Sequence, residues 1–161
     1  MGGAKATRTF EGRPLWSYGR DLLGECCPQV VLLGHCPELE LPALVEELPG
    51  QGPLGGVVCA LKHSSTPWNL VLALDYPLLT ADIVDRLKPA HGLACLPRCQ
   101  GQAHPLCGYY HRDAAAPLGE ALAAGERSLL RALDGLGEQV HWVDFEDDRP
   151  FLNVNHLSDL R

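Results

Sequence analysis

The chain of 161 residues has little positive charge, few aromatic side chains and no long apolar segment. It carries 13 Lys and Arg against 20 Asp and Glu, a formal charge of −7. Because an acidic surface repels a phosphate backbone, this balance argues against nucleic-acid binding. No apolar run approaches the roughly 18 residues that cross a membrane, and residues 2–13 lack the apolar core of a signal peptide. We therefore expect a cytoplasmic protein with neither nucleic acid nor membrane as a partner.

The cysteines do not follow the pattern of a disulfide framework or of a structural zinc site. Their number, seven, is odd, and without a secretion signal reduced thiols are the expected state. Cys95, Cys99, His104 and Cys107 follow a C-x3-C-x4-H-x2-C spacing that is not typical of zinc, and they fall on two apolar segments. Buried thiols are therefore favoured over a zinc site. No Ser-His-Asp or Cys-His triad can be assembled.

What the sequence does contain is an alternation of short apolar runs with helical segments, the pattern of βαβ units. Strands are expected at 30–34, 69–75, 92–98, 104–111 and 140–145, and helices at 14–24, 40–48, 53–63, 80–88 and 113–137, the last broken near Gly125, with a final helix after Asn155. Because no repeat or long linker divides the chain, residues 1–161 are predicted to form a single domain. The predicted fold is α/β: a three-layer, Rossmann-like, doubly wound and mainly parallel sheet.

Asp75 is the first candidate functional residue. It ends the strongest apolar run of the chain, 69–75, and ligands gather at the carboxyl ends of strands in open α/β sheets. A carboxylate there could hold Mg²⁺ for phosphoryl or nucleotidyl transfer. The alternative is a turn or helix cap, but Thr80 is already placed to cap the next helix. We favour the metal.

Two further segments carry candidate residues at the end of the chain and at a predicted helix start. Asn153 and Asn155 place two amides on one face, where they could ligate a cation or orient a phosphate, although Asn155 could instead only cap the last helix. Gly52, Pro53 and Leu54 begin a glycine-rich helix start that is either a close-approach loop beside a nucleotide or a simple turn.

The N-terminal residues Gly2, Gly3 and Lys5 have the composition of a phosphate-binding loop. Glycines let backbone N–H groups approach a phosphate, and a lysine adds a positive charge. As a bare motif this is weak, because the first residues of many chains are frayed.

Taken together, these segments resemble the molybdenum cofactor guanylyltransferase family. The motifs that carry the resemblance are, in chain order, GRPLW (12–16), GPLGG (52–56), TPWNLVLALDYPLL (66–79), HPLCGYYHRD (104–113), AAGERSLLRAL (123–133) and VDFEDDRPFLNVNHLSDL (143–160). The resemblance implies transfer of GMP from Mg-GTP to molybdopterin with release of pyrophosphate.

The resemblance also assigns roles to individual residues. Asp75 matches the magnesium aspartate, Lys5 the phosphate-contacting lysine within the loop of Gly2 and Gly3, and Asn153 and Asn155 the paired asparagines on the molybdopterin side. Gly52, Pro53 and Leu54 are expected to lie beside the nucleotide. A molybdoenzyme or chaperone partner and a homo-oligomer are further possibilities.

The family opens with a strand and a Leu-Ala-Gly-Gly turn that have no match here, so the sheet is expected to lack its usual first strand. Two interpretations of this difference stay open: a truncated enzyme, or a relative that kept the fold and lost the nucleotide site. The second includes a non-catalytic module that binds molybdopterin or a partner. A transferase that uses another nucleoside triphosphate or a sugar phosphate is a third alternative.

Overall fold

The computed structural model describes residues 8–34, 42–44 and 50–153 of the chain. The helices in these ranges are α2 (Leu15–Cys26), α3 (Gly52–His63), α4 (Ala81–Arg86), α5 (Ala115–Ala123) and α6 (Leu129–Asp134), with short 3-10 helices η1 (Arg112–Ala114), η2 (Gly137–Gln139) and η3 (Arg149–Phe151). The strands are β1 (Thr9–Phe10), β2 (Arg13–Pro14), β3 (Leu32–Leu33), β4 (Ala43–Leu44), β5 (Trp68–Leu72), β6 (Ala94–Cys99), β7 (Gln102–Ala103), β8 (Cys107–His111) and β9 (Val140–Phe145). No helix in these ranges is long and apolar enough to cross a membrane.

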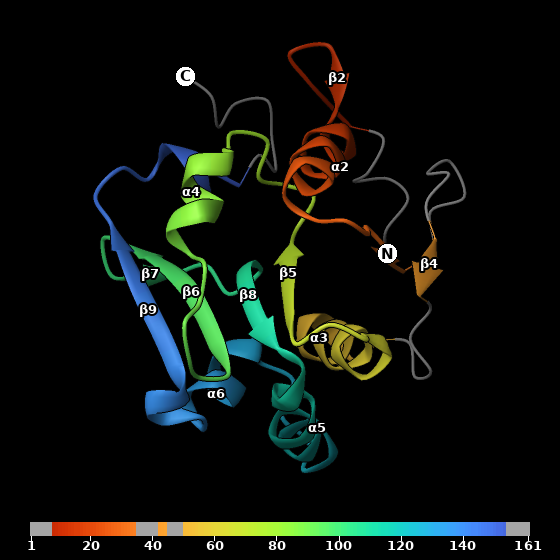
Figure 1. The fold of residues 1–161 in the computed structure, drawn as a ribbon, viewed down its shortest axis with the longest axis vertical. Coiled ribbons are helices and arrows are strands. Elements are labelled where there is room, and N and C mark those ends of the chain that lie inside the picture. The colour runs from red at the N-terminus through yellow and green to blue at the C-terminus, as the bar shows by residue number, and fades with distance from the viewer. Residues whose placement is uncertain (1–7, 35–41, 45–49, 154–161) are drawn as a thin grey trace.

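The main sheet is mixed. Strand β6 pairs in parallel with β9 on one side and antiparallel with β8 on the other, and β8 pairs antiparallel with β5. Strands β5, β6 and β9 therefore run in the same direction, and β8 runs against them (Figure 1). The short β7 folds back on the end of β6, and β3 and β4 form a separate parallel pair.

Helices cover both faces of this sheet. Because neighbouring strand residues point to opposite faces, residues of one strand pack against different helices. Val71 of β5 joins a core cluster with residues of α3, α5 and α6. Leu70 and Leu72 face the other side and pack with residues of α2 and α4. Figure 1 shows the same division, with α2 and α4 in the upper part and α3, α5 and α6 in the lower part. The predicted three-layer α/β class is confirmed.

The helix predicted over 40–48 is wrong where it can be checked. Ala43 and Leu44 form β4, which pairs with β3, and the carbonyl oxygen of Pro42 accepts a hydrogen bond from the N–H of Leu32 at 2.8 Å. Pairing with a distant strand has overridden the helical preference of this local sequence. The remaining residues of that span lie outside the described ranges.

Other predicted elements keep their type and shift only at their ends. The helix expected over 14–24 continues to Cys26, past Gly24. The break expected near Gly125 is confirmed, since α5 ends at Ala123 and Gly125 has a φ of +96°, which a helix does not allow. The outer strand expected at 140–145 is β9. The final helix expected after Asn155 lies outside the described residues.

Candidate functional site

Asp75 lies at the end of the sheet where three strands finish. It follows the last residue of β5 by three positions, and β5, β6 and β9 share one direction, so all three end at the same edge. Asp75 is half-buried, and the Oδ1 atom of its carboxylate is buried. The strand direction thus brings a carboxylate and the segment that follows β9 to one edge, as the sequence predicts for a ligand site in this fold class.

A cluster of three rings connects these two segments. The Oη atom of Tyr76 lies 3.4 Å from Nδ1 of His104, and the His104 ring stacks on Phe151 with the ring centroids 4.9 Å apart. Tyr76 directly follows Asp75, and Phe151 lies two residues before Asn153. Contacts through His104 therefore bind the turn after β5 to the segment after β9.

His104 is buried in this cluster, with 7% of its surface exposed, and this burial lowers the pKa of its imidazole. Burial also raises the pKa of Tyr76 well above its ordinary value. Both side chains are therefore uncharged at neutral pH. From the sequence, His104 was considered only as a zinc ligand, and its contact with Phe151 was missed. The two residues are far apart along the chain, and no local sequence pattern predicts that they meet.

The cysteine prediction agrees with the structure. Cys95, Cys99 and Cys107 are all buried in the apolar cluster on the α2 and α4 side of the sheet. Across the described residues, no group of three or more His, Cys, Asp or Glu side chains gathers that could hold a metal ion.

Of the three residues predicted to lie beside the nucleotide at the start of α3, Gly52 and Pro53 are exposed and Leu54 is buried. Gly52 has a φ of +67° and Pro53 occupies the first turn, while the Leu54 side chain is fully buried in the core. Leu54 can therefore fix the loop but cannot contact a ligand with its side chain. A Cβ atom added to Gly52 would lie 3.8 Å from the carbonyl oxygen of Arg127, so the loop before α6 adjoins the start of α3.

Glu126 organises that adjoining loop. Its Oε1 atom accepts hydrogen bonds from the backbone N–H of Ser128 at 2.7 Å and of Arg127 at 2.8 Å, and these bonds lower the pKa of its carboxyl group. Ser128 in turn caps α6, since its Oγ accepts from the N–H of Arg131. The GERSL motif is thus a helix-start motif in this structure, and it abuts the GPL segment.

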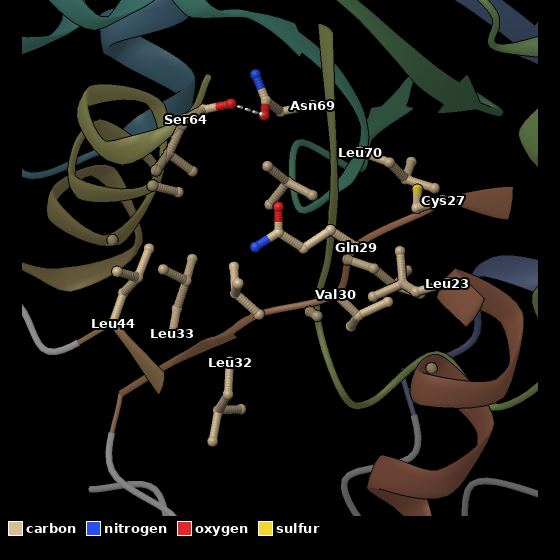
Figure 2. Close-up of a pocket in the computed structure, with 18 of the residues that line it drawn as sticks. Leu23, Cys27, Gln29, Val30, Leu32, Leu33, Leu44, Ser64, Asn69 and Leu70 are labelled. Atoms are coloured by element: carbon tan, nitrogen blue, oxygen red, sulfur yellow. Dashed lines mark hydrogen bonds between the residues drawn. The ribbon is translucent and has the colours of Figure 1, made fainter. Parts of the chain in front are cut away.

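A cavity of about 700 Å³ lies between α2, α3, β3 and β5 (Figure 2). Every residue of 68–74 lines it, as do Leu32 and Leu33 on the opposite wall. Because successive strand residues point to opposite faces, a cavity that touches all of them adjoins the backbone edge of β5 and not one of its faces. Within the described ranges, β5 has β8 as its one paired neighbour.

The cavity extends from the start of α3 to the residues that precede Asp75. Gly52 and Pro53 line one side, and Ala73 and Leu74, directly before Asp75, line another. Its volume lies within the range of small-molecule sites. Figure 2 shows leucine and valine side chains around most of it, with the polar groups of Gln29, Ser64 and Asn69 inside, the last two hydrogen-bonded to each other.

The other predicted site residues can be placed only in part. Asn153 is exposed at the end of the segment anchored by Phe151. Gly2, Gly3, Lys5 and Asn155 lie outside the described residues, so their proposed proximity to Asp75 stays a prediction.

Comparison with known proteins places this chain among nucleotidyltransferases. Residues 1–139 match the model of the MobA-like NTP transferase domain. The probable molybdenum cofactor guanylyltransferase of Chloroflexus aggregans is 35% identical over 158 residues, covering 87% of this chain and 74% of that protein. The corresponding Bacillus licheniformis protein is 30% identical, covering 99% of this chain and 88% of that protein.

Solved structures show the same fold. Molybdopterin-guanine dinucleotide biosynthesis protein A from Archaeoglobus fulgidus superimposes with a TM-score of 0.78 at 24% identity, covering 99% of this chain and 88% of that one. The 2-C-methyl-D-erythritol 4-phosphate cytidylyltransferase of Thermus thermophilus has a TM-score of 0.69 at 20% identity, with 98% and 91% covered. By the match over residues 1–139 and by its identity with these relatives, the chain belongs to the MobA-like NTP transferase family.

Proposed function

We propose that this protein is a nucleotidyltransferase of molybdenum cofactor biosynthesis that transfers GMP from Mg-GTP to molybdopterin. The observation that carries the proposal is the position of Asp75. It is a half-buried carboxylate at the edge where β5, β6 and β9 end, in a chain that matches the transferase family over residues 1–139. The relatives named as guanylyltransferases support GTP as the donor.

The chemistry of Asp75 fits a magnesium ion. Mg²⁺ prefers oxygen ligands and is commonly bound by one or two carboxylates together with substrate phosphates, so a single carboxylate can suffice from the protein side. Asp75 is a carboxylate of this kind, and it lies half-buried at the sheet edge. When bound, Mg²⁺ would neutralise the charge that develops on the phosphates during transfer.

The remaining residues are proposed to position the two substrates. Lys5 and the backbone N–H groups of Gly2 and Gly3 would hold the triphosphate of GTP. The backbone at Gly52 and Pro53 would lie beside the nucleotide, fixed by the buried Leu54. Asn153 and Asn155 would hold the acceptor phosphate through their amides.

In the proposed reaction an oxygen of the terminal phosphate of molybdopterin attacks the α-phosphorus of GTP. A new phosphorus–oxygen bond forms there, the bond from the α-phosphorus to the bridging oxygen breaks, and pyrophosphate leaves with the electron pair. Catalysis of this kind depends on positioning and on stabilising phosphate charge, which is the work assigned to these residues.

The first test replaces Asp75 with Asn, which keeps the shape of the side chain and removes its charge. Loss of the anionic oxygen should reduce Mg²⁺-dependent pyrophosphate release by at least about 100-fold, a typical effect of removing one electrostatic group from a transfer site. The matched control is Asp134→Asn, an exposed carboxylate at the end of α6, which should leave the rate unchanged.

Both variants should unfold at temperatures close to that of the wild type, which separates a catalytic effect from a folding effect. Full Mg²⁺-dependent turnover by Asp75→Asn would rule out the assignment of Asp75 as the metal carboxylate.

A further inference from the structure

We propose that Tyr76, His104 and Phe151 form a positioning unit that holds the Asp75 turn and the Asn153 segment at a fixed separation, with His104 as its central positioning residue. This inference rests on the proposed function, in which those two segments serve the donor side and the acceptor side of one transfer. No one of the three rings is assigned a direct contact with a substrate.

His104 is anchored independently of both segments. Its backbone N–H donates to the carbonyl oxygen of Pro97 in β6 at 3.1 Å, and its own carbonyl oxygen accepts from the N–H of Cys107 in β8 at 3.1 Å. The residue is therefore fixed to the two inner strands of the sheet. What it touches through its side chain is held relative to that rigid frame.

The ring of His104 makes a different contact with each segment. On one side Nδ1 meets the hydroxyl group of Tyr76, and the two rings stand edge to face at 78°. On the other side the ring stacks on Phe151 at an interplanar angle of 23°. Phe151 also packs edge to face against Phe145 at the end of β9, with centroids 5.1 Å apart, which fixes its own position.

An apolar ring would fill this space equally well, so the polar atoms of His104 need an explanation. The hydroxyl group of Tyr76 can donate a hydrogen bond to Nδ1 when the imidazole proton is on Nε2. A buried polar atom that lacks a partner is costly, so this hydrogen bond favours one orientation of both rings. A histidine ring can stack on Phe151 and at the same time accept the hydrogen bond from Tyr76.

Position at this edge matters for transfer because the rate depends steeply on the alignment of the reacting groups. A misplacement of about 1 Å by a distant substitution can lower a rate by roughly 100-fold. Movement of the Asp75 turn relative to Asn153 would change the separation of donor and acceptor without removing a group that binds either of them.

The test uses two variants that remove the hydrogen bond and keep the rings, His104→Phe and Tyr76→Phe. Each should lower kcat by about 10- to 100-fold while the KM for GTP changes by less than about threefold. The double variant should lose no more than either single one, because both remove the same bond. In His104→Asn the amide oxygen lies near the position of Nδ1, so this variant should have a higher kcat than His104→Phe. The matched control is His141→Phe, which changes an exposed histidine of β9.

A second measurement keeps the inference testable apart from the activity. Hydrogen exchange of the backbone amides at 73–79 and at 146–153 should accelerate together in His104→Phe and stay unchanged in His141→Phe. If the wild type has no turnover, the proposed function fails, and exchange alone then decides whether the two segments are coupled. Unchanged exchange, or altered exchange with a wild-type kcat, would overturn the positioning role.

Discussion

At the scale of single residues, the site is determined by a few polar side chains whose surroundings decide their state. Asp75 is a half-buried carboxylate at the sheet edge, and His104 is neutral because burial lowers the pKa of its imidazole. Glu126 is the opposite case. Two backbone N–H groups lower the pKa of its carboxyl group, so it is charged and holds the loop beside Gly52.

This state of Glu126 predicts a pH-dependent stability. Its pKa is lower in the folded chain than in the unfolded one, so its contribution is present above the ordinary glutamate value of about 4.3 and is lost as pH falls through the folded value. Wild type and Glu126→Gln should therefore differ most in Tm near pH 7 and converge in acid. The control Glu120→Gln changes an exposed carboxylate in the middle of α5. A Tm difference that does not vary with pH would contradict this account.

At the scale of elements, the sequence predicts what depends on local pattern. The apolar run that became β5, the strand at 140–145 and the break at Gly125 follow from side-chain periodicity and from the backbone freedom of glycine. Strand β4 could not be predicted from local pattern. It has only two residues, and they are a strand because they pair with β3. The Tyr76–His104–Phe151 cluster is likewise a product of the fold.

Two glycines test the packing of these elements in opposite directions. Gly19 lies within α2, and a Cβ there would meet Leu72 Cδ2 at 3.6 Å, which is an ordinary contact. Gly19→Ala should therefore raise the free energy of unfolding by up to about 1 kcal/mol.

In β8, a Cβ on Gly108 would lie 2.6 Å from the carbonyl oxygen of Cys95, which is too close. Gly108→Ala should therefore lower the free energy of unfolding by about 1–3 kcal/mol.

Urea unfolding at 25 °C measures both changes. The two variants share the same substitution, so the effect of alanine on the unfolded chain is common to them and the difference reports the space around each Cβ. Destabilisation by Gly19→Ala, or a neutral Gly108→Ala, would show that the contacts of α2 or β8 differ from those described.

At the scale of the whole molecule, the common direction of β5, β6 and β9 matters most for function. It brings segments from distant parts of the sequence, the turn that holds Asp75 and the segment that follows β9, to one edge of the sheet, and His104 connects them through Tyr76 and Phe151. The position of Asp75 at that edge was predicted from the end of one apolar run. The contacts among Tyr76, His104 and Phe151 could not be predicted, because the sequence does not show which strands end at the same edge of the sheet.

The central claim is that this edge transfers GMP to molybdopterin, and product formation tests it most directly. The wild-type protein is incubated with Mg²⁺, molybdopterin and one of GTP, CTP or ATP, and the products are identified by mass spectrometry. We predict molybdopterin guanine dinucleotide and pyrophosphate in equal amounts with GTP, dependent on Mg²⁺, and little product with the other two. Absence of any dinucleotide with GTP, or a faster reaction with CTP or ATP, would contradict the account.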